Sequence, residues 1–118
     1  GDGDRVAASL TLLDEADAHV WEPGAAPPAE RIELLEAAKA RGLTTWASLE
    51  PVIDPVQTLA IIRQTAAAGI VDHYRVGTLN GHPHARTVDW RAFARDVRDL
   101  LDAVGAAYTL KADLRRWL

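Results

Sequence analysis

Two Glu-Pro pairs, Glu22-Pro23 and Glu50-Pro51, each follow a strand-like apolar run and lead into an amphipathic helix. In a β/α barrel the loops after the strands carry the chemistry, so each carboxylate stands where a ligand would bind. Strand-like runs recur at residues 6–13, 43–49, 70–77 and 107–110. Because helices separate these runs and no hairpin dipeptides join them, the pattern predicts parallel strands connected by right-handed crossovers.

The predicted fold class is α/β, a partial (β/α) barrel fragment of about three β/α units with parallel strands. A length of 118 residues predicts a single domain over residues 1–118. Residues 1–5 are expected to be a flexible lead-in. A complete barrel needs about 250 residues. The sequence also contains no Met, which suggests that it was cut from a longer chain.

The composition excludes several classes of function. A net charge of −4 gives no clustered basic face for a nucleic-acid backbone. No run approaches the roughly 20 apolar residues of a membrane span, and no signal-peptide pattern opens the chain. A cytoplasmic protein is therefore expected. There is no cysteine, so thiolates cannot hold an iron–sulfur cluster.

Local signals predict where the helices begin and end. Prolines start the first helix and Gly42 ends it, whereas Asp54 and Asp89 are predicted to cap the next two. The last of these helices has the clearest apolar face, formed by Trp90, Phe93, Val97, Leu100, Leu101 and Val104. Residues 14–28 and 78–87 are predicted to be long βα loops, and loops of that length are commonly functional or disordered.

Glu50 is the first candidate for chemistry and Lys111 is a further one, because each follows the carboxyl end of a predicted strand. Glu50 can accept hydrogen bonds from a ligand, or it can anchor a loop by pairing with Arg31 or Lys111. Lys111 can bind a carboxylate or phosphate as a compact positive charge, or it can pair with Glu50 or Asp113.

Ser9, Thr11, Asn80 and Glu22 are further candidates. Ser9 and Thr11 alternate with leucines, so their hydroxyls are predicted to share one face of the first strand, as ligand contacts or as satisfied core groups. Asn80 lies in the third βα loop. Glu22, beside Trp21, binds a ligand or pins its own loop.

His82 and His84 flank a proline in the loop over residues 78–87. A His-x-His pair serves as a metal ligand in some barrel hydrolases. No carboxylate follows before Asp89, so surface histidines are the favoured interpretation.

Several segments together resemble the later part of radical SAM proteins related to spore photoproduct lyase. The matching segments cover nearly the whole chain in the right order: residues 21–24 (Trp-Glu-Pro-Gly), 30–32, 41–42, 46–52 (Trp-Ala-Ser-Leu-Glu-Pro-Val), 76–80, 89–90 and 108–114.

The resemblance implies a partial barrel that binds a [4Fe–4S] cluster through a cysteine loop and holds S-adenosylmethionine across its strand ends. Reductive cleavage of that cofactor gives a 5′-deoxyadenosyl radical, which abstracts hydrogen from a substrate. By the resemblance, Ser9 corresponds to a polar contact to the cofactor. Thr11, Glu50, Asn80 and Lys111 are carried over as further cofactor-binding positions.

The cysteine loop of that family is missing here. We therefore expect the cofactor and substrate side of such a barrel, which would bind S-adenosylmethionine but not catalyse radical chemistry by itself. The cluster would occur only in a full-length parent enzyme. The partner would then be the missing amino-terminal half of the barrel. A second hypothesis is a non-catalytic β/α domain that binds a partner or self-associates through the open edge of the first strand. A third is a fragment of a barrel hydrolase that holds a metal on His82 and His84.

Overall fold

The computed structural model describes residues 4–118, and residues 1–3 lie outside the described part. Strands and helices alternate along the chain. In order, the elements are β1 (Arg5–Ser9), α1 (Glu15–Trp21), α2 (Pro28–Ala40), β2 (Thr44–Leu49), α3 (Pro55–Ala68), β3 (His73–Val76), the 3₁₀ helix η1 (Pro83–Thr87), α4 (Trp90–Ala103), β4 (Ala107–Leu110) and α5 (Ala112–Arg115).

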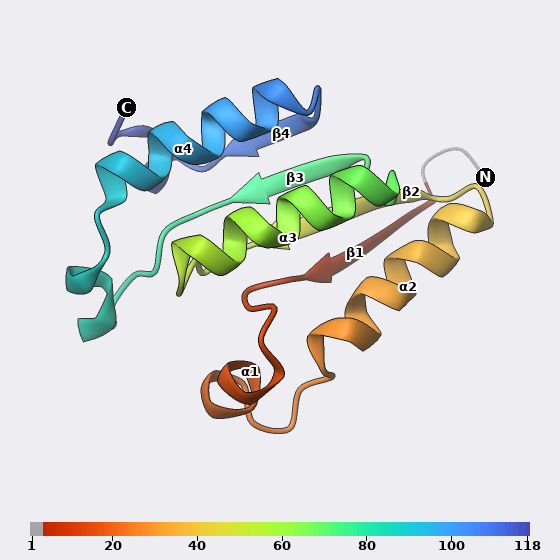
Figure 1. Cartoon of the computed structure of the whole chain (residues 1–118), viewed down its shortest axis with the longest axis horizontal. Helices are drawn as coiled ribbons and strands as arrows, with labels where there is room; N and C mark the ends of the chain where they lie inside the picture. The colour runs from red at the N-terminus through yellow and green to blue at the C-terminus, as the bar shows by residue number, and fades with distance from the viewer. Residues whose placement is uncertain (1–3) are drawn as a thin grey trace.

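The four strands form one open, all-parallel sheet in the order β1-β2-β3-β4 (Figure 1). The prediction of an α/β fold with parallel strands is confirmed. The expected lead-in over residues 1–5 extends too far, because β1 already begins at Arg5; the part of it at residues 1–3 lies outside the described residues.

The two faces of the sheet differ in burial. One face is covered by helices and holds the core, with Ala47, Leu49, Tyr74 and Val76 all at most 1% exposed. The alternate residues point to the opposite face, which we call the open face. Its side chains are exposed or half-buried: Arg5, Ala7, Ser9, Trp46, Ser48, His73, Arg75, Ala107 and Thr109.

The predicted helix signals act as expected. Asp54 caps α3 by accepting from the Val56 N–H, and Asp89 caps α4 by accepting from the Ala92 N–H. Gly42 lies just after the end of α2 and has a φ of +79°, a conformation that favours glycine. Val104 is an exception: it lies beyond the last residue of α4 and is 41% exposed, so it does not extend the apolar face.

The two long loops contain helical structure. Residues 14–28 include α1, capped by the Asp14 side chain, and residues 78–87 include η1. No residue of α1 is buried. A helix with no buried face does not need apolar residues at helical spacing, and such spacing is the main sequence signal of a helix. None of the helices within residues 4–118 is long and apolar enough to span a bilayer.

Candidate functional site

The carboxyl edge of the sheet carries an ion pair between two predicted site residues. Glu50 directly follows β2, and Lys111 follows β4 and precedes α5. Lys111 Nζ lies 2.8 Å from Glu50 Oε2, and Arg75 Nε lies 4.0 Å from Glu50 Oε1. The backbone N–H of Lys111 donates to the carbonyl of Val76 at 2.9 Å, so the sheet itself positions the lysine.

Gly77 makes room for this pair. It follows β3, the strand between β2 and β4. A Cβ at Gly77 would lie 2.6 Å from Glu50 Oε2 and 3.0 Å from Lys111 Cδ. The missing side chain therefore allows Glu50 and Lys111 to meet across the middle strand.

Asn80 lies near the same edge but has a different partner. Its amide Nδ2 donates to Asp113 Oδ2 at 2.8 Å, and the Thr78 backbone N–H donates to the other carboxylate oxygen at 3.3 Å. Burial opposes ionisation of Asp113, but these hydrogen bonds outweigh it and hold its pKa below the ordinary value. Asn80 thus fixes the loop after β3 to the start of α5.

Thr11 belongs to a third cluster, with Glu22 and Arg31. The strand ends at Ser9, so Thr11 does not continue the alternation with Ser9 as predicted. It is 5% exposed, and its hydroxyl donates to Glu22 Oε1. The position of the strand end is set by tertiary contacts, which the alternating pattern does not contain.

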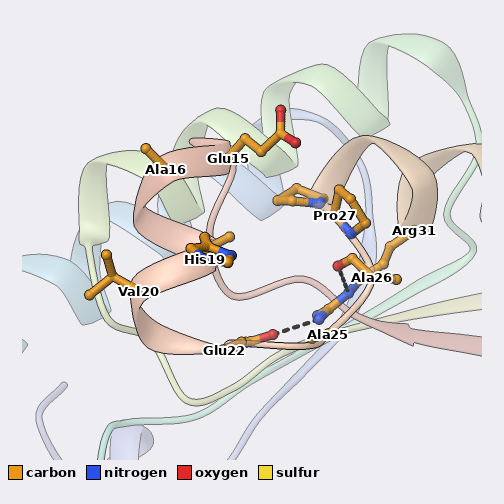
Figure 2. A pocket seen from close by; sticks show the side chains of 11 residues that line it. Glu15, Ala16, His19, Val20, Glu22, Ala25, Ala26, Pro27 and Arg31 are labelled. Atoms are coloured by element: carbon orange, nitrogen blue, oxygen red, sulfur yellow. Dashed lines mark hydrogen bonds and ion pairs between the residues drawn. The ribbon is translucent and has the colours of Figure 1, made fainter.

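Arg31 joins this cluster to the backbone (Figure 2). Its guanidinium donates to Glu22 Oε2 at 2.6 Å, to the Ser9 carbonyl at 2.8 Å and to the Ala26 carbonyl at 2.9 Å. Burial opposes ionisation of Glu22, but the hydrogen bonds from Thr11 and Arg31 outweigh it and lower its pKa. The arrangement fits the loop-pinning interpretation of Glu22.

A hollow of about 700 Å³ lies beside this cluster, between α1 and the start of α2 (Figure 2). His19, Val20, Pro27 and the Glu22–Arg31 pair are among the residues that line it. The hollow is distinct from the Glu50–Lys111 pair. Arg31 is more buried than Lys111, at 17% against 35% side-chain exposure, and binds two backbone carbonyls as well as Glu22, so it is less free to change partner.

Ser9 lies on the open face, in register with Ser48 of β2, which is in register with Arg75 of β3.

Closer to the amino ends of the strands, a row of stacked side chains crosses the sheet. The Arg5 guanidinium lies 4.4 Å from the centre of the Trp46 ring, and Trp46 stacks on His73 at 4.1 Å.

His73 ends this row by hydrogen bonding through Nε2 to the Thr109 hydroxyl at 2.9 Å. Burial, and secondarily the charge of Arg5, lower the His73 pKa. The imidazole therefore stays neutral near pH 7.

His82 and His84 pack against Trp21, with ring centres 4.9 and 5.1 Å from the indole. His84 Nε2 also lies 2.8 Å from the carbonyl oxygen of Ile53. Within residues 4–118 no group of three or more His, Cys, Asp or Glu side chains is arranged to hold a metal ion. These histidines connect α1 to the loop after β3.

The structure thus brings together Glu50 and Lys111. Ser9 and Thr11 are linked instead through Arg31 and Glu22, and Asn80 binds Asp113. Sequence reasoning missed Arg75 and the stacking of Trp46 on His73. The sequence contained a signal for both. Trp46 and Ser48 alternate along one predicted strand and His73 and Arg75 along the next, so each pair is expected to point to one face of the sheet.

Comparison of the chain with models of protein families, with curated proteins and with solved structures gave no match.

Proposed function

We propose that this chain forms the S-adenosylmethionine and substrate side of a radical SAM-type partial barrel. The observation that carries the proposal is the Glu50–Lys111 pair at the carboxyl edge of a parallel sheet whose helices cover one face. An open sheet with sequential strand order is the arrangement expected of a piece of a β/α barrel. The resemblance to relatives of spore photoproduct lyase supplies the identity of the ligand.

The side chains at this edge match the groups of S-adenosylmethionine. The Glu50 carboxylate can accept from the ligand's ammonium group or ribose hydroxyls, and the Lys111 ammonium can bind its carboxylate. The Ser9 hydroxyl is exposed on the same open face. Thr11 and Asn80 are held by Glu22 and Asp113, so we assign them to positioning the loops.

The [4Fe–4S] cluster does not fit this chain, because no cysteine occurs in the 118 residues. In the resembling family the cofactor supplies an organic radical after reduction by that cluster. We therefore assign binding alone to this chain. On binding, Lys111 and Glu50 would exchange their mutual ion pair for contacts to the ligand. Arg75, 4.0 Å from Glu50, would remain as a positive charge beside the carboxylate.

Isothermal titration calorimetry with S-adenosylmethionine tests the proposal. Saturable binding is expected, with at least a tenfold weaker affinity in Glu50→Gln and in Lys111→Gln, which corresponds to about 1.4 kcal/mol. The matched control is Glu36→Gln, a charge removal at an exposed position of α2. The absence of saturable binding, or an equal loss in Glu36→Gln, would contradict the proposal.

A second candidate is a non-catalytic domain that acts through partner binding or self-association. It is favoured by β1, which lies at an edge of the sheet and has a neighbour on one side within residues 4–118. Unpaired edge strands are templates for pairing with another chain. Under this alternative the open face and the β1 edge together would form the interface.

Sedimentation of two charge insertions tests the second candidate. Ala7 is exposed on the open face, whereas Leu10 is 1% exposed in the core. If the wild-type chain self-associates through this edge, Ala7→Lys will shift it to monomer. Leu10→Lys will instead unfold the chain, at a cost of several kcal/mol for an unpaired buried charge. A wild-type chain that is monomeric at every concentration excludes self-association.

A further inference from the structure

A second, smaller hollow lies on the open face and has a volume of about 180 Å³. Small side chains leave space over the middle of β1 and β2, at Ala7 and Ser48. By register, Arg5 and Trp46 lie toward the amino ends of the strands, and Arg75 and Glu50 toward the carboxyl ends. Two arginine side chains thus line the hollow.

Two side chains that line this hollow, Arg75 and Ser48, donate no hydrogen bond within residues 4–118. Arg75 is half exposed, and its one ion-pair partner within residues 4–118 is Glu50 at 4.0 Å, which is too far for a hydrogen bond. The Ser48 hydroxyl, which also lines the hollow, has no hydrogen-bond partner among the same residues. A guanidinium next to a hydroxyl can donate hydrogen bonds to the oxygens of an anion.

The charge balance of the open face also favours an anion. The four strands contain no acidic residue. Glu50 is the carboxylate that lines the hollow, and Lys111 compensates it at 2.8 Å. Among the residues that line the hollow, Arg5 and Arg75 thus leave an excess of two positive charges, close to the charge of about −1.5 to −2 on a phosphate monoester at pH 7.

The hollow is also preorganised. Arg5 lies over Trp46, Trp46 stacks on His73, and His73 hydrogen bonds to Thr109. This row of contacts holds one wall of the hollow in place before any ligand arrives, which reduces the entropy lost on binding.

We propose that the open face binds a phosphate group of a small molecule, held between Arg75 and Arg5 over the hydroxyl of Ser48. The inference does not rest on S-adenosylmethionine binding: its ligand groups are Arg75, Arg5 and Ser48, although Glu50 and Arg75 line both places. A phosphate monoester carries two charges for the two arginines, whereas a carboxylate carries one.

Inorganic phosphate serves as the probe, titrated into ¹⁵N-labelled protein at constant ionic strength and pH 7.5. The Trp46 indole N–H and the Ser48 amide signals are expected to shift saturably. Arg75→Gln should weaken binding at least tenfold, and Arg5→Gln at least threefold. Arg63→Gln is the matched control, because Arg63 is exposed on α3 away from the open face, and it should bind as the wild type does.

Further arms separate this inference from its alternatives. Acetate at the same ionic strength should bind at least fivefold more weakly than phosphate; equal affinity would overturn the assignment to phosphate. Glu50→Gln should bind phosphate at least as tightly as the wild type, although it loses S-adenosylmethionine, so the two proposals can fail separately. The proposal is wrong if no signal saturates, if Arg75→Gln binds normally, or if Arg63→Gln loses as much affinity as Arg75→Gln. The dispersion of each spectrum confirms that the variant is folded.

Discussion

Lys111 Nζ and Glu50 Oε2 lie 2.8 Å apart, although β3 runs between the strands that carry them. They meet because Gly77 has no side chain. We therefore expect Gly77→Ala to displace the Glu50 carboxylate and to break the ion pair. The change should cost about 1 kcal/mol more in the wild type than in a Glu50→Ala background, where no carboxylate occupies the space.

Urea unfolding of the four proteins in this cycle measures the coupling between Gly77 and Glu50. In the Glu50→Ala background the added methyl group meets only Lys111 Cδ closely, at 3.0 Å, and this flexible side chain is released from its ion pair. The change is therefore expected to be nearly neutral, since alanine loses less backbone entropy than glycine. Equal effects of Gly77→Ala in the two backgrounds would show that Glu50 does not occupy the space above Gly77.

The Glu22 cluster predicts a stability that depends on pH. Because its hydrogen-bond partners lower the Glu22 pKa in the folded state, the carboxylate stabilises the protein above its unfolded pKa of about 4.3. This stabilisation is lost as the pH falls through the folded pKa. Glu22→Gln should lower the free energy of unfolding at pH 7 by about 1–3 kcal/mol.

The difference between Glu22→Gln and the wild type should shrink as the pH falls below 4, and thermal unfolding across that range measures it. Glu33→Gln is the control, because Glu33 is exposed on α2. A difference that is constant with pH would mean that the charge of Glu22 is not what holds the loop.

His73 is expected to titrate below the ordinary histidine pKa of about 6.5. Its pKa is lowered by burial and by Arg5. The unfolded chain therefore takes up the proton first, so stability declines as the pH falls below the unfolded pKa and levels off below the folded one. NMR titration of the imidazole gives the folded value directly. Trp46→Ala uncovers the ring and should raise this pKa; an unchanged pKa would show that the stacked indole does not bury His73.

Asp72 connects the amino ends of β2 and β3. Its carboxylate accepts from Lys39 Nζ at 2.6 Å and from the Thr45 backbone N–H at 2.8 Å. The Lys39 hydrogen bond is the main cause of its lowered pKa. Asp72→Ala leaves the Thr45 N–H without this acceptor and should cost about 1–3 kcal/mol.

Asp72→Asn separates the two contributions at this position. It keeps an oxygen for Thr45 and removes the charge that faces Lys39, so it should cost less than Asp72→Ala by about 1 kcal/mol. Urea unfolding at pH 7 measures both variants. If they are equally destabilised, the backbone hydrogen bond is not the dominant contact.

The local signals of the sequence predicted the starts of α3 and α4 but not α1 or η1. Asp54 and Asp89 cap the helices that they were expected to cap, because a capping hydrogen bond joins residues two or three positions apart. A capping contact therefore needs little information from the rest of the chain. The alternation of predicted strands and helices along the chain likewise indicated parallel strands.

The contents of the site depend on distant residues and were only partly predictable. The sequence allowed Glu50 to pair with Arg31 or Lys111. Arg31 is taken by Glu22, and the strand order brings Lys111 within reach across Gly77. The assignment of Thr11 to the strand was wrong for the same reason, since β1 ends where Arg31 binds the Ser9 carbonyl.

The strand order has a consequence for how the protein is made. Because the order in the sheet equals the order in the sequence, each strand pairs with the one that precedes it. A sheet with this order could be completed from one edge, with each new strand pairing beside the strand made just before it. No segment has to be threaded between strands that are already paired.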